Sequence, residues 1–203
     1  MDVNIFYLFM MDETLNIFSE KEKACLREDW KSFQTVLKQN GVRCLFHITD
    51  SKNIDSIYKA KALLSKNEQV KRDIFPTRKG GNDLSDSLEE KKGLVNYVHL
   101  AFTSNLPMFS SSQRSTRSNP IVTPVALEID PRIILLKFSK FSNINALDNS
   151  AQIGSELEDL ERVNFDLIKR VRWSTDQERK EMQAEILVQN FVPIKYIKKM
   201  YRI

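Results

Sequence analysis

Residues 180–188 read Lys-Glu-Met-Gln-Ala-Glu-Ile-Leu-Val, and they mark the point where a polar, helix-favouring segment turns into a short apolar strand. Ile186 and Val188 lie on one face of that strand, because side chains alternate along a strand. Glu185 and Leu187 therefore share the other face. A carboxylate in this position is costly to bury unless it has a partner or a chemical role. Two interpretations stay open: a Glu at a strand mouth, solvated or paired with a nearby Lys or Arg, or a functional carboxylate.

The overall composition is that of one ordinary globular domain. The chain has 203 residues, of which 41% are hydrophobic and 29% are charged. This length is sufficient for a substantial core. The net charge is +4, and the sequence pI is near 9.0. A mildly basic protein is compatible with an anionic partner.

Few residues are available for metal or phosphate chemistry. Five Gly and two His leave little room for a Gly-rich phosphate loop or a histidine metal cage. Cys25 and Cys44 are too far apart for a Cys-x-x-Cys motif, so we predict no metal site. We expect two buried thiols in a reducing cytosol, and a single disulfide is the alternative. The apolar run 5–11 is short and follows Asp2, so it is neither a signal peptide nor a membrane span. We expect a cytoplasmic protein without a membrane contact.

Helical and strand patterns follow one another irregularly. Ser19 and Glu22 have the spacing of a capping box, and the helix that they open is expected to end at Gly41. The segment 66–93 is polar and is predicted to be a long loop with at most one helical turn. Pro124 indicates an edge strand or a bulge. Strands are predicted over 43–49, 95–102, 121–129 and around Glu185, with 133–136 continuing the sheet; helices are predicted after Asp50 and within 148–172, and a last helix or strand over 192–203.

This order of elements favours an α+β fold, because strands lie before, between and after helices without regular βαβ alternation. We divide the chain into an N-terminal helical extension, residues 1–40, packed on a main domain of residues 41–203.

His47 and Thr49 alternate on a predicted strand, so both side chains project from the same face. An imidazole can donate or accept a hydrogen bond and a hydroxyl can do both, which suits the two hydroxyls of a ribose. A partly buried His that is satisfied by a main-chain carbonyl is the alternative.

Several separated segments, in order along the chain, resemble the DarT family of toxin ADP-ribosyltransferases, which attach ADP-ribose from NAD to nucleic-acid bases. The resemblance spans about residues 40–200 of the chain. The segments are Leu45-Phe46-His47-Ile48-Thr49 followed by Asn53-Ile54; Tyr97-Val98-His99-Leu100-Ala101-Phe102 followed by Pro107-Met108; Phe141-Ser142-Asn143-Ile144-Asn145-Ala146; Trp173; and Gln183-Ala184-Glu185-Ile186-Leu187-Val188.

The resemblance implies an ADP-ribosyltransferase-like fold with a split, antiparallel-rich sheet, and a site that uses NAD as ADP-ribose donor. It implies that Glu185 is the catalytic carboxylate, which stabilises the positively charged sugar that forms when nicotinamide leaves and helps to deprotonate the acceptor base. The positions that it assigns to NAD binding are His47, Ile48, Thr49, Asn53, Phe102 and Met108. Core packing is an equally good interpretation of Phe102 and Met108.

One position departs from the family pattern. The family has an Arg in the segment before the second strand, where it holds an NAD phosphate, and our alignment puts Asp86 at or beside that place. An acid cannot replace a bidentate phosphate donor and would repel the pyrophosphate. Three explanations stay open: Arg78 or a nearby Lys takes over, the enzyme is weakened, or it has been deliberately inactivated.

The acceptor side combines cations with an aromatic ring. Arg114, Arg117, Arg172 and Trp173 are predicted to bind substrate, with Trp173 stacking on an extruded base. A solvated surface and a core Trp are the alternatives.

We therefore expect an NAD-dependent ADP-ribosyltransferase toxin from a toxin–antitoxin or phage-defence system that modifies bases of nucleic acid. We expect the nucleic acid to be single-stranded, with DNA as the favoured acceptor and RNA as the second choice. The alternatives are a protein-modifying transferase and a catalytically weakened basic binding module of the same fold. An antitoxin protein is the expected partner, with the apolar N-terminal residues as a contact.

Overall fold

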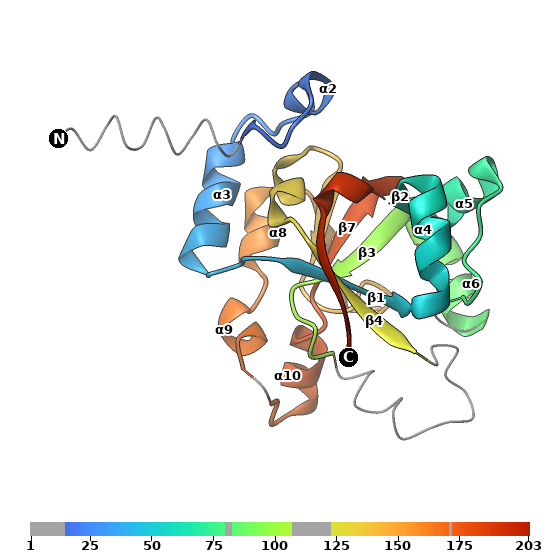
Figure 1. Ribbon diagram of the computed structural model, residues 1–203. Coiled ribbons are helices and arrows are strands. Elements are labelled where there is room, and N and C mark those ends of the chain that lie inside the picture. Colours follow the sequence, from blue (N-terminus) through green and yellow to red (C-terminus); the bar gives the residue numbers. More distant parts are fainter. Residues whose placement is uncertain (1–14, 80–82, 107–122, 171) are drawn as a thin grey trace.

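The structure, a computed structural model, describes residues 15–79, 83–106, 123–170 and 172–203. A seven-stranded sheet with the strand order β6-β5-β7-β3-β1-β4-β9 forms its centre, and every neighbouring pair is antiparallel (Figure 1). Strands β2 and β8 form a separate antiparallel pair. This sheet with helices around it confirms the predicted α+β class. The strands are β1 (Leu45–Asp50), β2 (Ala62–Leu64), β3 (Tyr97–Ala101), β4 (Pro124–Ile129), β5 (Ser139–Ser142), β6 (Ile153–Gly154), β7 (Glu185–Gln189), β8 (Phe191–Pro193) and β9 (Ile197–Arg202).

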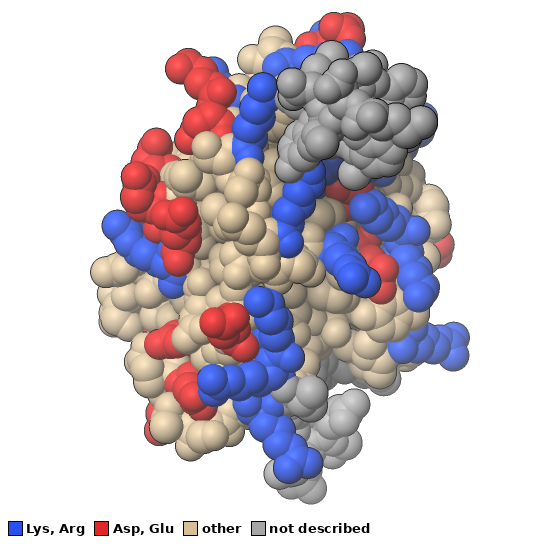
Figure 2. Space-filling view, turned by 90° about the vertical axis from the view of Figure 1, so that its left-hand side faces the viewer, with Lys and Arg blue, Asp and Glu red and all other residues tan. Residues whose placement is uncertain are grey.

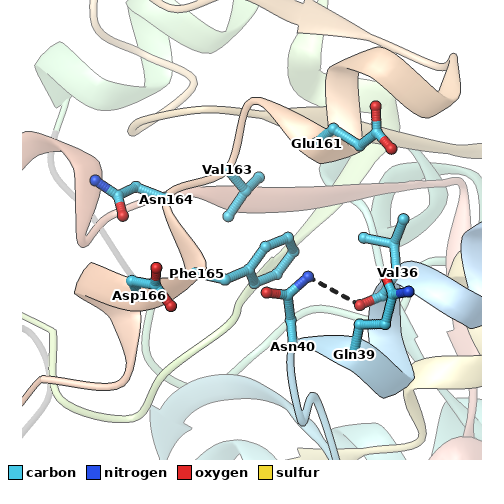
Figure 3. A pocket seen from close by; sticks show the side chains of 8 residues that line it. All are labelled: Val36, Gln39, Asn40, Glu161, Val163, Asn164, Phe165 and Asp166. Atoms are coloured by element: carbon cyan, nitrogen blue, oxygen red, sulfur yellow. Dashed lines mark hydrogen bonds between the residues drawn. The ribbon is translucent and has the colours of Figure 1, made fainter.

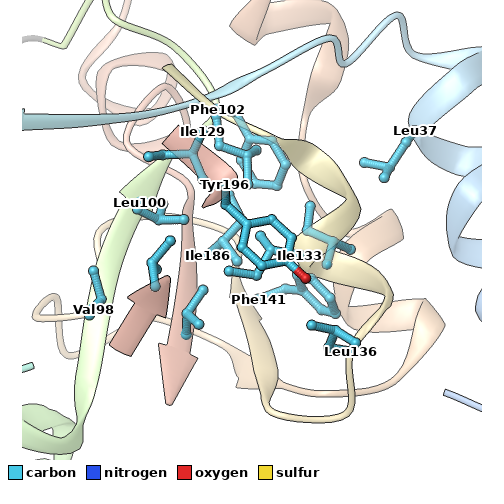
Figure 4. Close-up of a cluster of buried hydrophobic side chains, with 14 of the residues drawn as sticks. Leu37, Val98, Leu100, Phe102, Ile129, Ile133, Leu136, Phe141, Ile186 and Tyr196 are labelled. Atoms are coloured by element: carbon cyan, nitrogen blue, oxygen red, sulfur yellow. The ribbon is translucent and has the colours of Figure 1, made fainter. Parts of the chain in front are cut away.

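One face of the sheet carries the main hydrophobic core (Figure 4). Leu100 of β3 lies opposite Ile186 of β7, and both are buried in this core beside Phe141. The alternation predicted around Glu185 is confirmed, because Val188 belongs to the same core whereas Leu187 belongs to a separate, smaller cluster. Burial of these apolar side chains provides the main driving force for folding.

The sheet opens in its middle. Strand β1 pairs with β4 at six positions and β3 pairs with β7 at five, but β1 and β3 pair only through Phe46 and Ala101. From that point the C-terminal part of β1 and the N-terminal part of β3 diverge. Their facing main-chain groups need other partners or a ligand, since buried peptide groups are rarely left without hydrogen bonds. The sheet is therefore split, as predicted.

Helices flank both ends of the sheet, with α3 and α8 near one end and α4, α5 and α6 near the other (Figure 1). The α-helices are α2 (Glu20–Lys23), α3 (Trp30–Gln39), α4 (Ile54–Ala60), α5 (Lys66–Arg72), α6 (Asp83–Lys91), α8 (Leu157–Glu161), α9 (Phe165–Ile168) and α10 (Asp176–Glu181), and the 3₁₀ helices are η1 (Ser51–Asn53), η2 (Leu94–Asn96), η3 (Pro131–Leu135) and η4 (Ile194–Tyr196).

The predicted loop over 66–93 is wrong, because α5 and α6 lie within it. Ser65 caps α5 by accepting a hydrogen bond from the main-chain N–H of Glu68. Cap residues of this kind stabilise a helix whose own side chains are polar. The two helices form one wall of the cavity described below.

Two further predictions need correction. Residues 133–136 do not extend the sheet: they fall in and just after η3, where Asp130 caps the turn and Pro131 occupies its first position. Strand β4 is not an edge strand, since β1 and β9 lie on either side of it. Pro124 is tolerated because it is the first residue of the strand, a position where a missing N–H costs little. The bulge of β4 lies at its other end, between Glu128 and Ile129.

The predicted N-terminal helix is two helices, α2 and α3, and the capping box of Ser19 and Glu22 is confirmed. Arg27, which lies between them, is buried and donates hydrogen bonds to the main-chain oxygens of Ile134, Ser139 and Ser155. Its guanidinium also lies over the ring of Phe33, 4.5 Å from the centroid. The connection between α2 and α3 is thus fixed to the main body by the charge-assisted hydrogen bonds of Arg27 and by the packing of its guanidinium on Phe33.

Two smaller points concern thiols and membranes. Cys25 and Cys44 are both free thiols, but Cys25 is exposed, so the expectation that both are buried is wrong. Within residues 15–79, 83–106, 123–170 and 172–203, no helix is long and apolar enough to span a membrane.

Candidate active site

A cavity of about 640 Å³ lies at the split between β1 and β3. Its walls come from both strands, from the α4–β2–α5 segment, from residues 74–79 and from α6, and Glu185 reaches it from β7. A second cavity, of about 270 Å³, lies between the end of α3 and the α8–α9 segment, where Asn40 bonds back to the main chain of Val36 (Figure 3). Only the larger cavity combines two histidines with carboxylates and cations, so we take it as the candidate site.

Glu185 is the first residue of β7 and lies opposite Ala101 of β3. Its Oε2 atom accepts a hydrogen bond from Nδ1 of His99 at 2.8 Å and one from the main-chain N–H of Ala146 at 3.3 Å. Burial by itself would lower the pKa of His99, but the Glu185 carboxylate, with Glu89, raises that pKa above its ordinary value. The carboxylate is therefore held by two donors from two different segments.

His47 reaches across the open part of the sheet. Its Nδ1 lies 3.1 Å from the main-chain oxygen of His99. A carbonyl oxygen only accepts hydrogen bonds, so this contact assigns the proton to Nδ1. Burial lowers the pKa of His47, which favours the neutral ring, and a neutral ring protonated at Nδ1 has an acceptor lone pair at Nε2.

The predicted residues of β1 line the cavity together: His47, Ile48 and Thr49. By register, Phe46 lies in one row with Ala101 and Glu185, so His47 and Thr49 project from the opposite face of the sheet. The cavity reaches both faces because β1 and β3 are separated here. The split thus brings together groups that a continuous sheet would keep apart.

Asn53 lies in the cavity wall, and its side chain makes hydrogen bonds within the protein. Its Oδ1 accepts from the main-chain N–H of Arg78 at 2.8 Å, and its Nδ2 donates to the main-chain oxygen of Arg78 at 2.7 Å and to Oγ1 of Thr49 at 3.0 Å. Two hydrogen bonds therefore join Asn53 to the main chain of residue 78, and a third joins Asn53 to Thr49 near the end of β1. The Arg78 side chain lies 3.8 Å from the buried carboxylate of Asp50.

Asp86 faces the cavity and is paired. Lys66 Nζ lies 2.5 Å from the Asp86 carboxylate and 2.9 Å from that of Glu89. Burial lowers the pKa of Lys66, but these two carboxylates outweigh it and raise the pKa above its ordinary value. The negative charge that Asp86 introduces is thus compensated by a cation in the same wall.

Not every predicted site residue reaches the cavity. Phe102 lies in the hydrophobic core, edge-on to Phe165 with the ring centroids 5.3 Å apart, and it is not among the residues that line the cavity. Arg172 is exposed and Trp173 is half-buried in the connection between α9 and α10, away from the cavity lining. Met108, Arg114 and Arg117 lie outside the described residues.

The surface charge is mixed on the side that carries α3. Lys and Arg side chains spread over the middle of this side, and Asp and Glu gather mainly toward one edge (Figure 2). Several charged residues of the described chain pair locally, as Arg170 does with Glu178 at 3.0 Å. Exposed pairs of this kind contribute little to stability and are screened by salt.

Sequence reasoning missed His99 and the N–H of Ala146 as partners of Glu185. The signal for His99 was its type: it is one of only two histidines and lies within an otherwise apolar strand. Its partner is 86 residues away in sequence, so only the pairing of β3 with β7 makes the contact evident. No sequence signal marks the main-chain donor of Ala146.

A large, split antiparallel sheet with helices around it is the arrangement of an ADP-ribosyltransferase-like fold. The fold is shared with two solved structures of Thermus sp. 2.9 DarT. The complex with ADP-ribosylated ssDNA has a TM-score of 0.67 at 18% identity, over 79% of this chain and 81% of that one. The complex with NAD+ has a TM-score of 0.62 at 18% identity, over 78% and 81%.

Thermosipho africanus DarTG in complex with ADP-ribose is a further structural relative, with a TM-score of 0.63 and 21% identity over 79% of this chain and 44% of that one. A sequence search of the curated proteins found no match. The family model described as "ssDNA thymidine ADP-ribosyltransferase, DarT" matches residues 46–203. The chain therefore belongs to the DarT family, which confirms the predicted family, fold and enzyme class.

Proposed function

We propose that this protein transfers ADP-ribose from NAD to a thymidine base of single-stranded DNA, and that the cavity between β1 and β3 binds the NAD. Membership of the DarT family supports the reaction and the acceptor. The Thermus relatives, bound to NAD+ and to ADP-ribosylated ssDNA, support the donor and the strand. A volume of about 640 Å³ is in the usual range for a cofactor pocket.

The observation that carries this proposal is the carboxylate of Glu185, which is fixed by His99 and Ala146 at the rim of a cavity large enough for a dinucleotide. When the bond between nicotinamide and ribose breaks, positive charge develops on the sugar. A preorganised carboxylate stabilises that charge without having to reorganise. The same carboxylate takes the proton that the acceptor base loses as its new bond to the ribose forms.

His47 and Thr49 are proposed to bind the ribose. The free acceptor of the His47 ring is Nε2, which suits a ribose hydroxyl as donor. Ile48 lines the same wall and offers apolar contact. Asn53 is proposed to act indirectly, through its three hydrogen bonds to Thr49 and to the main chain of Arg78.

Arg78 and Lys66 are proposed to provide the positive charge for the pyrophosphate in place of the family arginine. Both line the cavity, and Lys66 already compensates Asp86. This arrangement favours an active enzyme over a weakened or disarmed one, because the repulsion expected from Asp86 is reduced. Arg172 and Trp173 are proposed to contact the DNA strand, as is usual for cations and aromatic rings that bind single strands.

The biological setting is also a proposal. We infer a cytoplasmic toxin whose partner is an antitoxin, since DarTG is among the structural relatives. A role in phage defence follows from the sequence resemblance alone. RNA and protein acceptors remain alternatives that the following experiment separates.

The test is to incubate the protein with labelled NAD and, separately, single-stranded DNA, duplex DNA, RNA and a protein extract. Label on single-stranded DNA from the parent, absent with Glu185→Gln, supports the proposal. The control is Arg162→Gln, which breaks an exposed ion pair with Asp159 away from the cavity and should label DNA as the parent does. Equal labelling by Glu185→Gln would contradict the catalytic assignment, and label on RNA or protein alone would replace the acceptor.

A further inference from the structure

We propose that His99 is a positioning residue, which holds the Glu185 carboxylate so that its Oε1 atom faces the reaction. This inference rests on the proposed function, since it assumes that Glu185 is the catalytic carboxylate. The sequence resemblance assigns no role to His99, and the inference is carried by the geometry of β1, β3 and β7 and by the main-chain N–H of Ala146.

The first step is the direction in which the two side chains point. Ala101 lies opposite Glu185 in the β3–β7 register, and His99 is two residues before Ala101. Side chains two residues apart on a strand share a face, so His99 and Glu185 project from the same side of the sheet as diagonal neighbours. The pairing of β3 with β7 therefore places the imidazole of His99 beside the carboxylate of Glu185.

The second step is which oxygen is held. The hydrogen bonds from His99 Nδ1 and from the N–H of Ala146 both go to Oε2, at 2.8 and 3.3 Å. A carboxylate with one oxygen held by two donors cannot rotate freely, which leaves Oε1 as the oxygen available to ribose or base. Fixed geometry of this kind is what a catalytic carboxylate requires, since a misplacement of about 1 Å can lower a rate on the order of 10²-fold.

The third step is that His99 links the two working parts of the site. Its main-chain oxygen accepts the hydrogen bond from His47, and its side chain donates to Glu185. His47, which is proposed to bind the ribose, and Glu185, which is proposed to act on it, are therefore both hydrogen-bonded to His99 of β3. In the described part of the chain, Nε2 of His99 is buried without a hydrogen-bond partner, so Nδ1 makes the contact that orients the ring.

This geometry predicts which substitutions are tolerated. The amide nitrogen of Asn lies about where Nδ1 of His does, whereas the amide of Gln reaches the position of Nε2. If His99 acts by donating from Nδ1, His99→Asn keeps the contact with Oε2 and His99→Gln does not. A residue that only fills space would not distinguish the two amides in this order.

The experiment compares kcat and KM for NAD, with single-stranded DNA as acceptor, in the parent, His99→Asn, His99→Gln and His99→Leu. Arg162→Gln serves as the control that should leave both constants unchanged, and thermal unfolding is measured for each variant. We expect kcat to fall about 10- to 100-fold in the Gln and Leu variants. In His99→Asn it should stay within about threefold of the parent, and KM for NAD should stay within about twofold in all three.

Two results would overturn the inference: equal loss of kcat in the Asn and Gln variants, or parental kcat in His99→Leu. If His99→Leu fails to fold, the comparison of the two amides still decides. Failure of the proposed function is distinguished by Glu185→Gln, measured in parallel. If that variant transfers ADP-ribose at the parental rate, the catalytic assignment itself is wrong, whatever the His99 variants do.

Discussion

The imidazole of His47 donates from Nδ1 to the main-chain oxygen of His99, 3.1 Å away, across the gap where β1 and β3 no longer pair. A side chain thus takes over a hydrogen bond that a continuous sheet would make through its main chain. The gap can stay open without leaving this carbonyl unsatisfied, which would otherwise cost about 1–3 kcal/mol.

The acceptor at Nε2 of His47 can be removed while the bridge is kept. His47→Asn places an amide nitrogen near Nδ1, so the bond to His99 is retained and the ribose acceptor is lost. We expect KM for NAD to rise about tenfold, the value of one hydrogen bond, while the unfolding temperature changes little. His47→Leu should raise KM and also lower stability. An unchanged KM in both variants would exclude His47 from NAD binding.

Asp86 offers a test of the charge balance in the cavity. Asp86→Asn removes one negative charge and leaves Lys66 with Glu89 as its partner. We expect KM for NAD to fall a few-fold, since Lys66 is then more available to the pyrophosphate, and the gain should shrink at high salt. Steady-state kinetics at two salt concentrations measure this. A rise in KM would mean that Asp86 organises the site.

Phe102 separates core packing from cofactor binding. It is buried against Phe165, so Phe102→Ala should lower the free energy of unfolding by about 3–5 kcal/mol. KM for NAD, measured on the folded enzyme at low temperature, should not change. Tyr58→Ala is the matched aromatic control: its side chain is exposed, and its loss should cost little. If KM for NAD rises in Phe102→Ala but not in Tyr58→Ala, Phe102 does contribute to NAD binding.

The raised pKa of His99 makes its contribution to stability depend on pH. A group whose pKa is higher in the folded protein stabilises the fold fully below its unfolded value, here 6.5, and loses that contribution as the pH rises through the folded pKa. The difference in unfolding free energy between the parent and His99→Asn should therefore be largest near pH 5.5 and decrease toward pH 8.5. Denaturant titrations at several pH values measure it.

The same comparison controls for the other charged groups. Glu185, Glu89 and Lys66 face residue 99 in both proteins. The lowered pKa of His47 changes stability with pH in the opposite direction, and it does so in both proteins. These contributions therefore cancel to first order in the difference between the two unfolding free energies. A difference that is constant or grows with pH would contradict the assigned direction of the His99 shift.

Local patterns were sufficient for the strands and for one cap. Alternation identified the strand of Glu185, and the spacing of Ser19 and Glu22 identified the start of α2. Helices α5 and α6 are mostly polar, and their few apolar residues give no clear apolar period: Val70 of α5 and Leu84 of α6 are exposed. Ile133, Ile134 and Leu135 of η3 are all buried. A run of consecutive apolar residues shows no alternation, so the sequence does not distinguish this turn from a buried strand.

The site was predictable only in part, because its contacts join residues that are far apart in the sequence. His47, Thr49 and Glu185 could be proposed from the family resemblance, but the contact of His99 with Glu185 joins residues 86 apart, and that of Lys66 with Asp86 joins residues 20 apart. Such contacts depend on how strands and helices are placed, which no local pattern contains. Phe102 shows the converse, since a residue within a family motif lies in the core.

The anchoring of Arg27 has a consequence for how this protein can be shortened. The family match starts at residue 46, yet Arg27 satisfies three main-chain oxygens of the segment 134–155, and Phe33 packs in the core against Phe141. We propose that residues 15–44 belong to the catalytic unit. A fragment starting at residue 46 should be recovered as insoluble or unfolded protein, whereas one starting at residue 15 should fold and retain NAD binding. By this proposal, the shortest fragment of the chain that folds is longer than the part that the family model matches.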